Sequence, residues 1–86
     1  MKPLEFQNLG KYLKEKRIAA GYTQAELAAR LKVHVQFVSN WERGLCAPPS
    51  HCFQRALDIL KAPRKKVAEV MVLDAQKVIE AKILKI

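Results

Sequence analysis

The sequence lacks long apolar runs, has few glycines and prolines, and contains little cysteine. Its longest apolar run covers residues 70–73, far fewer than the roughly 20 residues that span a bilayer, so no membrane segment is expected. With only 3 glycines and 4 prolines in 86 residues, the chain does not have the composition of a disordered or low-complexity segment. We therefore expect one soluble, cytoplasmic globular domain with a single modest core.

The two cysteines exclude a scaffold held together by several disulfides. Cys46 and Cys52 lie near His51, with His34 further away, which raises the question of a metal site. A structural zinc site uses four ligands, usually paired as Cys-x-x-Cys or His-x-x-x-His, and neither spacing occurs in this sequence. We expect no metal and no cofactor.

Positive charge is what the chain has in excess. Lysine and arginine number 16 against 8 aspartates and glutamates, a net charge of +8. Such an excess on a small domain indicates an anionic partner, most often nucleic acid. Charge alone leaves open the alternative that the basic residues only keep the protein soluble.

The apolar periodicity predicts four or five helices and no convincing strand. The second helix has a predicted capping box, in which the Thr23 hydroxyl caps the helix and Glu26 reaches back three residues later. The last segment would also tolerate a strand around its β-branched residues, but helix-forming residues fill its other positions. The predicted helices cover residues 8–20, 23–31, 35–43, 50–60 and 64–86.

The third predicted helix has two different sides. Val38 and Trp41 point to one side, whereas Gln36, Asn40 and Arg43 recur on the other at helical spacing. Two short helices joined by a tight turn form a helix-turn-helix, and glutamine and asparagine can hydrogen-bond base edges in the major groove. The alternative is an ordinary helical hairpin whose polar side is only hydrated.

The segments TQAELAARLKV and VSNWERG narrow this choice. They resemble the Cro and lambda-repressor type of helix-turn-helix, the Xre-like group, as does Lys16-Arg17-Ile18 upstream, and the resemblance covers roughly residues 9–61. It implies a compact bundle of about five helices, which agrees with the all-α fold and the additional C-terminal helix that the periodicity predicts. It also implies binding to double-stranded operator DNA as a symmetric dimer.

The same resemblance implies roles for individual residues. Base contacts are expected at the start of the third helix, although Phe37 could equally be half-buried against the second helix. Gln24 is expected to contact a phosphate and to brace Gln36. The expected base contacts are Val35, Gln36, Phe37 and Asn40, and the expected phosphate contacts are Thr23, Gln24, His34 and Arg43.

Two charges on predicted core faces are explained by the same family pattern, which pairs Arg17 with Glu42. A catalytic role for Glu42 is the alternative, but no nucleophile or second carboxylate stands near it in the sequence. We therefore expect that the protein is not an enzyme. Two positions depart from the family. Lys32 replaces the usual turn glycine and must adopt a left-handed conformation, and His34 replaces a serine or threonine cap.

The tail has an apolar stripe that we expect to be a dimer interface. We therefore divide the single domain into a helix-turn-helix core, residues 1–62, and a dimerisation segment, residues 63–86. The alternative is that this helix folds back onto its own domain. The expected interface residues are Val67, Val70, Met71, Val78 and Ile79.

The expected function is sequence-specific regulation of transcription. The resemblance implies a bacterial or phage repressor that reads the major groove of a palindromic operator as a homodimer. The alternative is an antitoxin that binds a toxin partner and represses its own operon, because members of this family also serve in that way.

Overall fold

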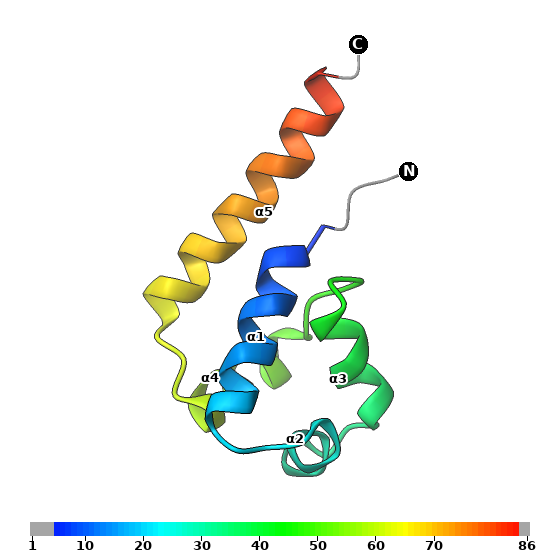
Figure 1. Cartoon of the computed structure of the whole chain (residues 1–86), viewed down its shortest axis with the longest axis vertical. Helices are drawn as coiled ribbons and strands as arrows, with labels where there is room; N and C mark the ends of the chain where they lie inside the picture. Colours follow the sequence, from blue (N-terminus) through cyan, green and yellow to red (C-terminus); the bar gives the residue numbers. More distant parts are fainter. Residues whose placement is uncertain (1–4, 85–86) are drawn as a thin grey trace.

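The computed structural model of the chain describes residues 5–84, and in this part it forms five helices and no strand. The all-α prediction is confirmed. None of the helices in this part is long and apolar enough to cross a membrane. The helices are α1 (Gln7–Ala19), α2 (Gln24–Leu31), α3 (Val35–Glu42), α4 (Ser50–Leu60) and α5 (Arg64–Leu84) (Figure 1).

Local interactions fix both ends of α2. The Thr23 hydroxyl accepts a hydrogen bond from the Glu26 backbone N–H at 3.1 Å, and the Glu26 carboxylate accepts one from the Thr23 N–H at 3.0 Å. The predicted capping box is confirmed. These bonds lower the pKa of Glu26. At the other end, Lys32 has a left-handed backbone with φ of 57°, as its turn position predicts.

Apolar residues from all five helices form one core. The predicted inner faces of α1, α2 and α3 are buried as expected, and Val33 in the turn packs partly against the core. The α4 residues Leu57 and Leu60 are buried too, while Phe53 is half-buried. The most buried of the large side chains on the first three helices are Leu9, Leu13, Leu27, Leu31, Val38 and Trp41.

Helix α5 packs against α1 in its first half and extends past the other helices in its second half (Figure 1). Val67 and Val70 are buried in the core of their own chain. This corrects their assignment to a dimer interface. It also means that a boundary at residue 62 does not separate the core from the tail, because α5 supplies part of the core.

A polar residue fixes the position of α5. The Asp74 carboxylate accepts hydrogen bonds from the backbone N–H groups of Asn8 at 2.8 Å and Leu9 at 2.9 Å. The first N–H groups of a helix have no partner within it, and a negative charge there is favoured by the helix dipole. Asp74 is only 3% exposed, so it caps α1 from inside the protein.

Candidate nucleic-acid interface

Helix α3 lies directly on the backbone of α1. A Cβ atom at Gly10 would overlap the carbonyl oxygens of Trp41 and Glu42, so only glycine allows this close approach. The residues of α3 that face α1 and α2 are the buried Val38 and Trp41. The opposite side of α3 therefore points away from the core.

A largely buried ion pair holds α3 to α1. The Arg17 Nε donates to Glu42 Oε2 at 2.6 Å, and the Arg17 Nη2 donates to Glu42 Oε1 at 3.1 Å. The two side chains are 10% and 4% exposed. Arg17 also donates to the carbonyl oxygen of Tyr22 at 2.8 Å. The pair predicted from the resemblance thus forms, and both Glu42 oxygens are used in holding the fold.

Gln24 differs from its predicted arrangement. Its amide nitrogen donates to Glu42 Oε1 at 3.0 Å, so it extends the ion pair and does not brace Gln36. Gln24 opens α2 and is half-buried. The first turn of α2 is therefore tied to the last turn of α3.

The outward side of α3 carries the two amides that the sequence predicts. Gln36 Nε2 donates to Asn40 Oδ1 at 3.0 Å. This bond leaves the Gln36 oxygen as an acceptor and the Asn40 nitrogen as a donor. Adenine presents the complementary pair in the major groove, its N6 amino group and its N7 acceptor. The two side chains thus form one unit with the polarity to read an adenine.

Two apolar side chains flank these amides at the start of α3. Val35 and Phe37 are each 48% exposed. The Phe37 ring lies 6.2 Å from the His34 ring, with the planes tilted by 43°. Phe37 therefore lies outside the core, and part of its ring is covered by His34. Its exposed edge is available for an apolar contact.

The predicted phosphate contacts stand at both ends of this surface. Thr23, His34 and Arg43 are exposed. His34 is extended and makes no cap with its side chain, as its poor capping ability predicts. Thr23 is occupied as an acceptor but keeps its hydroxyl proton as a donor. Arg43 forms the C-cap of α3.

Two arginines that the sequence analysis did not single out brace the helix-turn-helix. Arg30 lies over the Tyr22 ring, 4.8 Å from its centre. Arg55 of α4 donates to the carbonyl oxygen of Arg30 at 3.1 Å. No sequence pattern marks either contact, because both join residues whose spacing is set by the tertiary fold.

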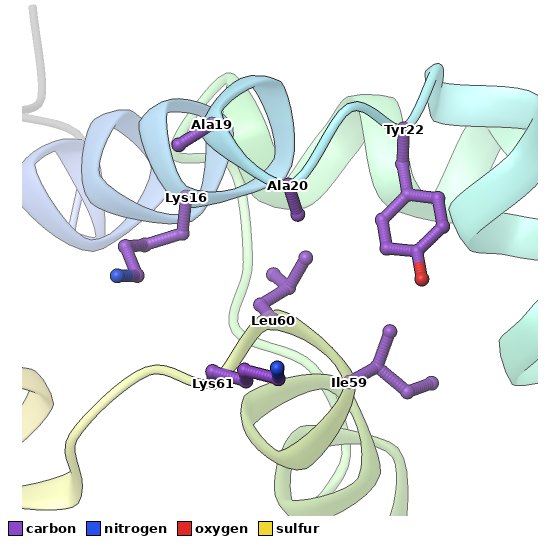
Figure 2. A pocket seen from close by; sticks show the side chains of 7 residues that line it. All are labelled: Lys16, Ala19, Ala20, Tyr22, Ile59, Leu60 and Lys61. Atoms are coloured by element: carbon purple, nitrogen blue, oxygen red, sulfur yellow. The ribbon is translucent and has the colours of Figure 1, made fainter.

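A hollow of about 410 Å³ lies elsewhere, between the C-terminal ends of α1 and α4. Figure 2 shows the side chains of Lys16, Tyr22 and Lys61 around it, with Leu60 between the two helices. None of its lining residues belongs to α3. It is therefore separate from the surface formed by Gln36 and Asn40.

The model of a protein family described as a helix-turn-helix domain matches residues 8–70. The match covers more than half of the chain and runs from α1 into α5. It includes every residue assigned above to the outward side of α3 and to the ion pair. No curated protein and no solved structure matches the chain.

Proposed function

The chain belongs to the helix-turn-helix domain family, of the Xre/Cro-like type, and on this premise we propose that it is a sequence-specific DNA-binding repressor of transcription. Helix α3 enters the major groove with its N-terminal residues leading. The remaining Cro-like expectations, a bacterial or phage source and a place in the cytoplasm on the nucleoid, belong to the same proposal.

The observation that carries this proposal is the outward pair of amides on α3. Gln36 and Asn40 are joined at 3.0 Å, so each holds the other in place before DNA arrives. An ordered pair loses less side-chain freedom on binding than two independent side chains. Val35 and Phe37 supply apolar contact to thymine methyl groups on either side.

The basic charge supplies the part of binding that does not depend on sequence. Phosphate contacts set the position of the protein on the duplex and carry no direct sequence information. We assign them to Thr23, His34 and Arg43, together with Gln24 if its amide turns outward. With a net charge of +8, affinity should fall steeply as salt rises.

The operator is proposed to be an inverted repeat that is bound by a homodimer. Two-fold symmetry in the protein requires two-fold symmetry in the site, with half-sites about 34 Å apart, one turn of DNA. The C-terminal half of α5 extends past the other helices (Figure 1), which supports α5 as the element that contacts the second copy.

Selection of bound sequences from a random DNA pool tests this proposal. We expect an inverted repeat with adenines at one position of each half-site. Gln36→Ala should then weaken binding to the selected site by about 1–3 kcal/mol, roughly 5- to 150-fold, and leave binding to random DNA unchanged. Gln76→Ala, which alters an exposed glutamine of α5, is the matched control. Equal losses on selected and random DNA would mean that Gln36 reads no base.

A further inference from the structure

The core-facing side of α1 changes character towards its C-terminal end. Leu9 and Leu13 begin a stripe that faces the core, and both are buried. At helical spacing the next two positions of this stripe are Lys16 and Ala20. Lys16 is half-buried and Ala20 is exposed. A charged side chain and a small one therefore occupy positions where larger apolar residues would fill the space between α1 and α4.

The space left at this end of the stripe is the hollow shown in Figure 2. Its volume of about 410 Å³ lies within the range of small-molecule sites, roughly 300–1,000 Å³. No acidic residue lines it, and its apolar lining residues are Ala19, Ala20, Ile59 and Leu60. Such sites are mostly apolar, with a few polar groups that orient the ligand.

The two ends of the hollow differ in chemistry. In Figure 2, Tyr22 and Ile59 lie together at one end, and Lys16 and Lys61 lie towards the other, with Leu60 between them. One end therefore offers two ammonium groups with three N–H donors each. The other end offers an aromatic ring and a branched aliphatic side chain.

The two lysines of the hollow have no acidic partner in the described part of the chain. Within residues 5–84, the ion pairs join Arg17 to Glu42 and Arg64 to Asp58. Positive charge at the end of a helix is favoured by the helix dipole, which accounts for lysines at the ends of α1 and α4. Their charges nevertheless remain without a carboxylate, so a bound anion would find both available.

A third positive charge stands near the other end of the hollow. The Arg30 guanidinium lies over the Tyr22 ring, 4.8 Å from its centre. Like charges that gather around a hollow without an acidic residue repel one another, and an anion between them reverses the sign of that interaction. The electrostatics of the hollow thus favour a negatively charged ligand.

We propose that this hollow binds a small organic acid with an apolar body. The carboxylate accepts hydrogen bonds from Lys16 and Lys61, and the hydrocarbon part lies over Leu60 towards Ile59 and Tyr22. An inorganic anion such as phosphate would use the lysines but leave the apolar lining exposed to water. The site is independent of the proposed function, because no residue of α3 lines the hollow.

A series of ligands tests the two ends of the hollow separately. The full chain is titrated with butanoate, hexanoate and octanoate, and binding is followed by the backbone amide signals in NMR spectra. Each added methylene group that is buried should tighten binding by up to about fourfold. Hexanamide, which has the same length as hexanoate but no charge, and inorganic phosphate, which has charge but no apolar body, should both bind more weakly than hexanoate. The shifted signals should centre on Ala20, Tyr22 and Leu60.

Single substitutions test the role of the lysines. Lys16→Gln and Lys61→Gln each remove one charge and keep a polar side chain, so each should raise the dissociation constant of octanoate by roughly fivefold or more. Lys14→Gln makes the same change at an exposed lysine of α1 that does not line the hollow. This matched control should bind octanoate as the wild type does. Thermal melts followed by circular dichroism show whether each variant is folded.

Four results would overturn the inference. The first is the absence of shifts at the hollow with any of the three acids. The second is equal affinity for hexanoate and hexanamide, or for octanoate and phosphate. The third is wild-type affinity in a folded Lys16→Gln variant. The fourth is a set of shifts centred on Val72 and Ile79, the exposed apolar residues of α5. None of these results concerns DNA binding, so a failure here leaves the proposed function as it stands.

Discussion

Helices α3 and α5 reach their places by different means. Helix α3 has 8 residues, with Val38 and Trp41 buried on one side and polar amides on the other. Helix α5 has 21 residues, and apolar side chains occur all around it. In α3 the apolar pattern decides which side is buried. In α5 that pattern cannot decide, and the carboxylate of Asp74 marks the side that faces α1.

The largest loss of unfolding free energy is expected from removing the ion pair that ties α3 to α1. Glu42→Ala leaves Arg17 buried without its carboxylate, and the loss of one partner of a buried pair costs about 3–5 kcal/mol. The free energy of unfolding, from denaturant titration, should fall by this amount. Glu80→Ala, at an exposed glutamate of α5, serves as the control. An unchanged unfolding free energy in Glu42→Ala would rule out a structural role for the pair.

The corresponding change in α5 is Asp74→Ala. It removes two charge-assisted hydrogen bonds and the cap of α1, and we expect a loss of about 2–3 kcal/mol in unfolding free energy. Amide hydrogen exchange at Asn8 and Leu9 should become faster than in the wild type. The control is Asp58→Ala, which removes an exposed carboxylate. If both variants lose the same small amount, Asp74 is not what holds α5 to α1.

A smaller effect is expected at the first turn of α2. Thr23→Ala removes one half of the capping box, at a cost of about 1 kcal/mol. It should also raise the pKa of Glu26, which the bonds to Thr23 hold below its ordinary value. A group whose folded pKa is depressed stabilises the protein above its unfolded pKa, and this is lost as the pH falls through the folded pKa. NMR titration of Glu26 in both proteins is the measurement, and an identical pKa would contradict the assignment.

The smallest change in stability is expected at the two lysines with a left-handed backbone. Lys32 ends α2 with φ of 57° and Lys61 ends α4 with φ of 53°. Glycine adopts this conformation without a steric penalty, so each change to glycine should stabilise the fold by about 0.5 kcal/mol. Thermal melts measure both. A destabilised Lys32→Gly beside a stabilised Lys61→Gly would show that the Lys32 side chain contributes to the helix-turn-helix.

Much of the fold could be predicted because its determinants are local. The capping box joins residues three apart, and the positions of the buried leucines repeat with the helical period. The left-handed turn at Lys32 is expected from the resemblance, because Lys32 stands where that family usually has a turn glycine. The resemblance to a known family added the pairing of Arg17 with Glu42, which lie 25 residues apart.

The rest depends on contacts between distant parts of the chain. Asp74 stands within an otherwise apolar stripe, and no periodicity indicates that its partners are backbone N–H groups 65 and 66 residues earlier. Gly10 similarly looks like a weak point in a helix until Trp41 and Glu42 are placed against it. Gln24 is close to Glu42 only once the two helices have docked.

The cap provided by Asp74 also has a consequence for the order of folding. Most contacts in small helical proteins join nearby residues and form quickly, whereas a contact across most of the chain must close a long loop. During synthesis, the capping box of α2 can form long before residue 74 exists. We therefore expect the first turn of α1, although it is synthesised before α5, to be completed only when the carboxylate of Asp74 reaches Asn8 and Leu9.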